Sequence, residues 1–227
     1  MCARYALFGP FPLGNLVPGF VEHVINPLAG FAQYNIAPSQ VNPVVVAGQG
    51  GPGLESMRWG LLPHWARDPK IAYSTINARA ETLVEKPAFR DAWRRGQRCL
   101  VPVTGWYEWV DLGGKRKQPY FLRAADGANP MMFAGLWSRW TDAEGRGVAT
   151  YTVVTTEAMG EVRRVHDRQP QALPAEAWDT WLRAPVAEAV ALLQPVVTAL
   201  RIAPVGAAVG NPRNQGPGLV EPLEDAG

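Results

Sequence analysis

The chain has 227 residues, of which 47% are hydrophobic and 19% are charged, an ordinary globular balance. Two cysteines are too few for a disulfide scaffold, and a net charge of +2 neither requires nor opposes a polyanionic partner. The sequence contains no secretory signal and no apolar stretch near the ~20 residues that span a bilayer. We therefore expect a soluble protein of a reducing compartment.

Short β-type segments dominate the chain. They are rich in β-branched and aromatic residues and are separated by Gly and Pro. The predicted strands cover residues 5–8, 44–47, 57–62, 98–103, 106–110, 120–123, 131–137, 149–155 and 197–203. Residues 111–114, Asp-Leu-Gly-Gly, predict a hairpin turn after the fifth of these strands.

Three segments have helical features. Residues 87–95 begin with proline and stop before Gly96, which is the usual polarity of helix ends. Residues 174–183 and 185–193 also begin with proline, and their apolar residues recur at helical spacing. Because strands and helices do not alternate regularly, we expect an α+β fold and not a doubly wound sheet.

The composition shows no domain boundary. We therefore expect one domain over residues 2–223, followed by a short tail at 224–227. Residues 10–30 are apolar but rich in Gly and Pro, which predicts irregular structure. Residues 206–227 also contain many Gly and Pro residues and are expected to be extended.

Cys2 offers unusual chemistry. Methionine aminopeptidases remove Met1 when the next side chain is small, which leaves an α-amine and a thiol on one residue. An aldehyde can form an imine with that amine and then close through sulfur into a five-membered thiazolidine. Both groups titrate near neutrality, at roughly 8 and roughly 8.5. A chance cysteine is the plain alternative, and Cys99, in an apolar run, is expected to be a buried thiol.

Two segments place polar groups where they suit catalysis. In residues 77–82, Asn77 can both donate and accept, and Arg79 has a cationic fork suited to phosphate, although turns and caps are commoner roles for asparagine. In residues 105–109, Glu108 lies inside an aromatic run. If Glu108 faces inward, desolvation would raise its pKa toward the range useful for acid–base catalysis, but strand alternation equally allows it to face solvent.

The other candidates are a histidine and an aromatic loop. His166 is followed by Asp167 and Arg168, a polar setting in which its pKa should stay near neutral, and a surface histidine is the alternative. Residues 59–65 predict a tight loop whose Trp65 can stack against a base, unless it is a packing residue. The scattered Cys and His residues predict no metal site.

Together these segments resemble the SOS-response-associated peptidase family, the SRAP domain, over nearly the whole chain. The motifs that carry the resemblance follow the family order and lie at residues 1–5, 34–38, 59–65, 77–82, 98–102, 105–109, 166–168, 204–205 and 220–223. The chain departs from the family pattern at two places. Gln169 stands where methionine is usual, and residues 210–214 contain an added proline, which affects the expected DNA channel more than the chemistry.

The resemblance implies a compact α+β fold with twisted, barrel-like antiparallel β-sheets and short flanking helices. It also implies a protein that binds single-stranded DNA with abasic sites and crosslinks its N-terminal cysteine to the ring-opened sugar through a thiazolidine, which shields the lesion. An AP-lyase activity is compatible with this chemistry. The residues that match catalytic positions are Cys2, Asn77, Glu108 and His166. The residues that match positions near the DNA are Arg4, Trp65, Arg79 and Arg168.

We expect no cofactor, no metal and no membrane partner, and a cytoplasmic monomer that associates with the nucleoid when bound to DNA. Two alternatives remain. A peptidase of the N-terminal-nucleophile type would also use Cys2, but only Met1 precedes it, so there is little leader to remove. A non-catalytic single-strand-binding module would explain the tryptophans and arginines but not the placement of Cys2.

Overall fold

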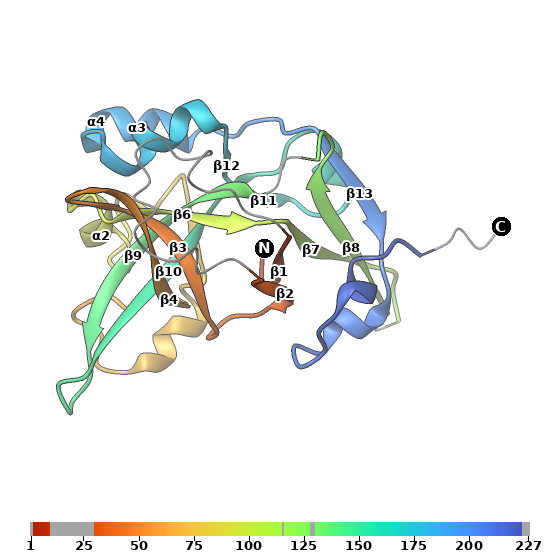
Figure 1. Cartoon of the computed structure of the whole chain (residues 1–227), viewed down its shortest axis with the longest axis horizontal. Helices are drawn as coiled ribbons and strands as arrows, with labels where there is room; N and C mark the ends of the chain where they lie inside the picture. Colours follow the sequence, from red (N-terminus) through yellow and green to blue (C-terminus); the bar gives the residue numbers. More distant parts are fainter. Residues whose placement is uncertain (1, 10–29, 115, 128–129, 224–227) are drawn as a thin grey trace.

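The structure is a computed structural model that describes residues 2–9, 30–114, 116–127 and 130–223. Figure 1 shows two sheets with short helices at their margins, and the amino-terminal end of the chain lies between the sheets. The expected α+β class is confirmed. The expected boundary of the domain at residue 223 stays a prediction, and the tail at 224–227 lies outside the described residues.

One sheet contains a closed barrel. Each of five strands pairs with two neighbours, and β10 completes the ring because it pairs with both β4 and β9. The five strands are β3 (Val41–Gly48), β4 (Gly51–Trp59), β6 (Arg98–Val103), β9 (Met131–Thr141) and β10 (Gly147–Glu157). The pairing is antiparallel except between β10 and β4, so the barrel is mixed and not purely antiparallel as expected.

Three short strands extend this sheet. They are β5 (Asn77–Arg79), which runs parallel to β10, β11 (Arg168–Pro170), which pairs with β10, and β12 (Ala172–Leu173), which pairs with β9. The sequence did not predict them because two or three residues are too few to show strand periodicity. Two of them carry residues of the candidate site.

The second sheet has five antiparallel strands in the order β13-β8-β7-β1-β2. Its members are β1 (Tyr5–Phe8), β2 (Ala32–Ile36), β7 (Gly105–Asp111), β8 (Lys117–Ala124) and β13 (Leu200–Pro204). Only Thr104 separates β6 from β7, so the chain passes almost directly from the barrel into this sheet. Gly105 is needed there because a Cβ would lie 2.4 Å from the Phe121 ring.

The helices are short. Predicted helix 87–95 becomes α2 (Arg90–Arg94), and predicted helices 174–183 and 185–193 each divide into a 3-10 turn and a short α-helix. These elements are η3 (Ala175–Ala177), α3 (Trp178–Arg183), α4 (Val186–Ala189) and η4 (Val190–Leu193). The Trp181 indole donates to the Cys99 carbonyl at 2.9 Å, which fixes α3 against barrel strand β6.

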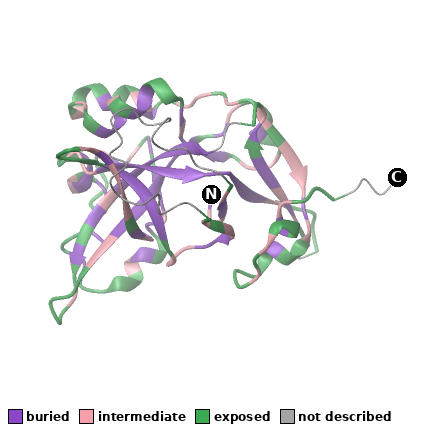
Figure 2. Cartoon of the chain, in the orientation of Figure 1, coloured by how far each residue is buried: buried purple, intermediate pink, exposed green. Residues whose placement is uncertain are grey.

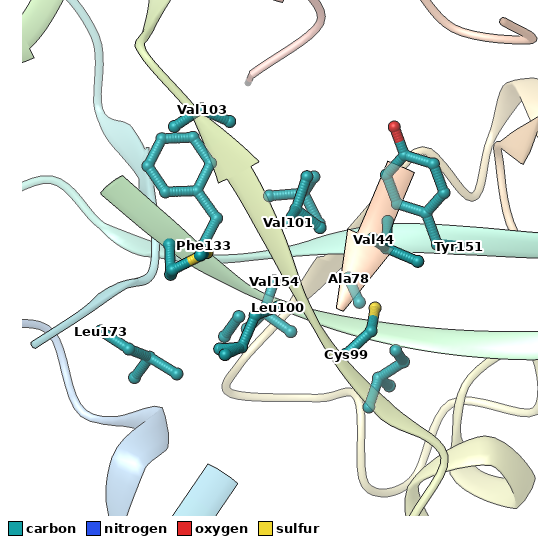
Figure 3. Close-up of a cluster of buried hydrophobic side chains, with 14 of the residues drawn as sticks. Val44, Ala78, Cys99, Leu100, Val101, Val103, Phe133, Tyr151, Val154 and Leu173 are labelled. Atoms are coloured by element: carbon teal, nitrogen blue, oxygen red, sulfur yellow. The ribbon is translucent and has the colours of Figure 1, made fainter. Parts of the chain in front are cut away.

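Much of the barrel and of the second sheet consists of buried residues (Figure 2), and apolar side chains of both sheets form the main core. Figure 3 shows part of this core, in which Val44, Cys99, Leu100, Phe133 and Tyr151 come from barrel strands. As expected, Cys99 is a buried free thiol. The largest fully buried side chains of this core come from the barrel (Trp59, Tyr151 and Phe133), from α3 (Trp181) and from the second sheet (Tyr5).

The carboxy-terminal segment covers the opposite face of the second sheet. Its elements are η5 (Ala207–Gly210) and η6 (Pro217–Leu219), and Val209 and Leu219 pack against Tyr107 and Phe121. The prediction of an extended tail from residue 206 was therefore wrong for the described part of that segment. Its Gly and Pro residues form tight turns, and its few apolar residues are buried. The predicted irregular stretch at 10–30 falls almost wholly outside the described residues.

Candidate active site

Backbone hydrogen bonds hold Cys2 between the two sheets. The β1–β7 register pairs Tyr5 with Trp106, and the Tyr107 N–H donates to the Arg4 carbonyl at 3.0 Å. Continuing this antiparallel register two residues beyond the Tyr5–Trp106 pair sets position 3 beside Glu108 on β7. From the barrel side, the Asn77 side-chain amide donates to the Cys2 carbonyl at 2.7 Å. The amino-terminal segment is thus tied to both sheets.

Glu108 faces the interior. Side chains alternate along β7, so Glu108 shares the face of Trp106, which packs in the main core, while Tyr107 faces the carboxy-terminal segment. Glu108 is 2% exposed. Burial raises the pKa of Glu108 to about 7, the positive charge of the chain's amino terminus opposes this shift, and Asp167 adds to it. The carboxyl group therefore titrates in the neutral range and not near the ordinary 4.5.

Asn77 lies on β5, next to Val153 of β10. Its side chain is buried, and its Oδ1 has no hydrogen-bond partner within the described part of the chain. Because the Nδ2 group already binds the Cys2 carbonyl, the free acceptor is on the same amide that holds the backbone of Cys2. An amine on Cys2 can therefore find an acceptor in this group.

His166 follows the 3-10 helix η2 (Gly160–Arg164). The backbone N–H of Arg168 donates to His166 Nδ1 at 2.9 Å, whereas the Asp167 carboxylate, 2.7 Å from the same atom, favours a proton there. Burial is the main cause that lowers the pKa of His166, and the charge of the amino terminus adds to it. We therefore assign the neutral ring with its proton on Nε2. The sequence predicted that the pKa of His166 stays near neutral in an open polar loop, but partial burial of the ring lowers it.

Electrostatics links the residues that were predicted to be catalytic. Burial is the largest cause of each pKa shift, and it raises the pKa values of Cys2 and Glu108 but lowers that of His166. The positive charge of the amino terminus acts on all three groups, and in each it favours a lower pKa. Asn77 joins the group through its bond to Cys2. The fold thus brings together four residues that lie far apart in the sequence.

The Cys2 thiol differs from its expected state. It is fully buried, and burial raises its pKa well above the ordinary value, with the Glu108 carboxylate as the next cause. The backbone N–H of Arg4 hydrogen-bonds the sulfur and acts in the opposite direction. The sequence predicted a thiol that titrates near neutrality, but in this environment the resting group is the neutral thiol. Any attack by sulfur needs a nearby base.

Arg168 holds two segments of the site together. Its guanidinium makes a bidentate ion pair with Glu81, with N–O distances of 2.7 and 2.9 Å, and also donates to the Thr155 carbonyl at 2.7 Å. The same carbonyl accepts from the Ala80 N–H. Glu81 follows the strand of Asn77, and Arg168 orients His166. Both residues lie in sequence motifs, at residues 77–82 and 166–168, but no local pattern in the chain pairs them.

The residues that were predicted to contact DNA fall into two groups. Arg79 and Trp65 are exposed and available to a ligand. Arg4 instead donates to Asn35 Oδ1 and to the Val209 carbonyl, both at 2.7 Å, and lies 5.8 Å from the Trp109 ring. Arg168 is 9% exposed. Each guanidinium is therefore engaged within the protein, Arg4 through Nη1 and Arg168 through Nη1 and Nη2.

The described ranges contain no cluster of His, Cys, Asp or Glu that could hold a metal ion. None of the helices in those ranges has the length and apolar character that crossing a membrane requires.

The chain is similar to members of one protein family over most of its length. A family model described as SOS response associated peptidase (SRAP) matches residues 1–212. The chain belongs to this family. It is 35% identical over 226 residues to abasic site processing protein YoqW of Bacillus subtilis, and the alignment covers 97% of this chain and 99% of that protein.

More distant SRAP relatives and solved structures extend the comparison. The chain is 31% identical to abasic site processing protein HMCES of Gallus gallus, over 84% of this chain and 66% of that protein. A crystal structure of a protein from Bacteroides thetaiotaomicron superimposes with a TM-score of 0.76 at 28% identity, covering 85% of this chain and 86% of that one. The SRAP fold is thus found well beyond the closely similar sequences.

Proposed function

We propose that this SRAP protein processes abasic sites in single-stranded DNA by linking Cys2 covalently to the ring-opened sugar as a thiazolidine. The observation that carries the proposal is the meeting of Cys2, Asn77, Glu108 and His166 around the amino terminus. The relatives named abasic site processing proteins support the substrate class. Removal of Met1 supplies the α-amine on Cys2.

Glu108 begins the reaction as an acid. The abasic sugar is mostly a closed hemiacetal, and opening it needs a proton on the ring oxygen while the anomeric hydroxyl loses one. With a pKa of about 7, Glu108 can donate the first and take the second. The Nε2 proton of His166 can then hydrogen-bond the freed hydroxyl. The product is an aldehyde held beside Cys2.

The same carboxyl group can complete the crosslink. The neutral amine of Cys2 adds to the aldehyde carbon, and Glu108 protonates the resulting hydroxyl, which leaves as water and gives an iminium ion. Glu108 is now a carboxylate next to a neutral thiol. The sulfur attacks the iminium carbon and its proton passes to Glu108, which restores the starting acid. The high thiol pKa is tolerated because the base forms only when ring closure needs it.

A denaturing gel distinguishes the proposed crosslinking from the two alternative functions, a peptidase and a non-catalytic binding module. The protein is incubated with single-stranded DNA that contains one abasic site, and a covalent adduct retards the DNA. Cys2→Ser keeps the amine but has a poor ring-closing nucleophile, so it should lose the stable adduct and still give an imine that borohydride traps. Cys99→Ala, which changes the other buried thiol, is the matched control and should crosslink normally.

Absence of an adduct with the wild-type protein contradicts the proposal and favours a binding module or a peptidase. An equally stable adduct with Cys2→Ser would show that sulfur does not close the ring. Intact-mass analysis of the active protein should give a chain that lacks Met1, and full activity in a preparation that retains Met1 would contradict the role of the α-amine.

A further inference from the structure

A hollow of about 270 Å³ adjoins the site and has no part in the proposed proton transfers. Its lining residues are Val110, Tyr120, Glu161, Arg164, Val165 and Ile202. They come from β7, β8, β13 and the η2 region, so the hollow lies where the second sheet meets the segment that carries His166.

The strand register explains why the hollow continues from the catalytic residues. Val110 is two residues beyond Glu108 on β7 and therefore projects from the same face. Tyr120 on β8 is the register partner of Glu108, and such partners also share a face. On the other side, Val165 directly precedes His166. A polymer whose reacting unit lies between Glu108 and His166 can therefore place its next unit in the hollow.

The chemistry of the lining suits a flat, mainly apolar group. Val110, Tyr120, Val165 and Ile202 are half-buried, which leaves their apolar surface open to a ligand. Pockets for drug-sized ligands run from roughly 300 to 1,000 Å³, so this smaller hollow suits one aromatic ring system. At the rim, the Arg164 guanidinium lies 2.7 Å from the Glu161 carboxylate. Both side chains are largely exposed, and such a pair is weak enough for a phosphate to compete for the arginine.

We propose that the hollow binds the nucleobase next to the abasic sugar, with the base stacked on Tyr120 and its phosphate near Arg164. This inference rests on the proposed function, because it names the part of the DNA that positions the lesion. The abasic sugar has no base of its own, so the protein needs a neighbouring base to align it. Stacking is tolerant of sequence because every base has a π face.

The test removes single bases from the DNA. Three single-stranded oligonucleotides each carry one central abasic site; one has all its other bases, and the others have a tetrahydrofuran unit in place of the 5′ or the 3′ neighbour. Wild-type protein should crosslink roughly tenfold more slowly when one of the two neighbours lacks its base, and not when the other does, because one stacked base is lost. The same series with tetrahydrofuran also at the central position, which cannot open to an aldehyde, measures affinity without crosslinking.

Tyr120→Ala should show a similar loss with the complete oligonucleotide and become insensitive to both base removals. Tyr120→Phe, which keeps the ring, should behave like wild type. Tyr73→Ala changes an exposed tyrosine outside the hollow and should keep the one-sided sensitivity. The proposal is overturned if wild-type protein responds equally to both base removals or to neither, or if Tyr120→Ala keeps the one-sided response. Failure of the proposed function is distinct, because it removes the adduct with every oligonucleotide while the affinity series still reports on the hollow.

Discussion

At the residue scale, burial acts on Glu108 and on the Cys2 thiol in the same direction. Both groups become negatively charged when they lose a proton, so a water-poor environment raises both pKa values. The consequences differ. Glu108 remains able to titrate near pH 7, whereas the thiol stays protonated until a base is formed beside it. In the proposed mechanism, this difference is the reason why the amine attacks before sulfur closes the ring.

Glu108→Gln should change activity and stability in opposite directions. It removes proton transfer and keeps shape, so crosslinking should slow by roughly 10²-fold while affinity for intact single-stranded DNA is nearly kept. The folded pKa of about 7 lies above the ordinary 4.5, so the folded state binds more protons and loses stability as pH rises from about 4.5 to about 7. Glutamine avoids that loss, and the variant should gain on the order of 1–3 kcal/mol at pH 8.

Thermal unfolding at pH 4 and pH 8, together with the crosslinking rate, checks both effects. The stability gain should shrink at pH 4, where the wild-type carboxyl is protonated in both states. A rate equal to wild type, or a rate that falls only in proportion to affinity, would make Glu108 structural and contradict the proposed mechanism.

At the element scale, the site depends on strands that are too short to be stable alone. β5 and β11 both pair with β10, and the Arg168–Glu81 ion pair joins them a second time. This arrangement sets the distance between Asn77 and His166. It also engages the guanidinium of Arg168 with the Glu81 carboxylate and the Thr155 carbonyl.

Glu81→Gln should therefore slow crosslinking by more than it weakens binding. The amide cannot form the bidentate ion pair, so His166 loses its fixed position, while a negative charge near the DNA disappears. We expect a rate reduced roughly tenfold and an affinity for single-stranded DNA that is unchanged or higher. Glu55→Gln, which breaks an ion pair with Arg139 on the barrel surface, is the matched control.

Crosslinking rate and affinity are measured for both variants as a function of pH. An equal fall in rate and affinity for Glu81→Gln, or the same effect for Glu55→Gln, would assign the ion pair to general stability and not to positioning. Glu81→Asp keeps the charge and should recover part of the rate.

At the scale of the whole molecule, one buried asparagine connects the two ends of the chain. Asn35 on β2 accepts from Arg4 and donates to the carbonyl groups of Val209, Asn211 and Asn214 at 3.3, 2.9 and 3.0 Å. The carboxy-terminal segment thereby covers the second sheet and holds the strand that leads back to Cys2.

Asn35→Ala should destabilise the protein by about 2–4 kcal/mol, because it leaves several buried polar groups without partners. Asn211→Ala changes an exposed residue of the same segment and should have little effect. Denaturant unfolding of the two variants checks this. Equal stability of Asn35→Ala and wild type would mean that the carboxy-terminal segment is held by its apolar contacts alone.

The sequence by itself determined the chemical groups and most of the strands. Cys2, Glu108 and His166 were found because their residue types are reactive, and strands such as Arg98–Val103 were found because a run of apolar β-formers is a local signal. The tertiary structure alone decided whether Glu108 faces inward, since alternation along β7 fits either face and only packing against the barrel buries one of them. It also decided the partners of Arg4 and Arg168 and the fold of residues 206–223, because these depend on contacts between distant segments that leave no periodic pattern in the chain.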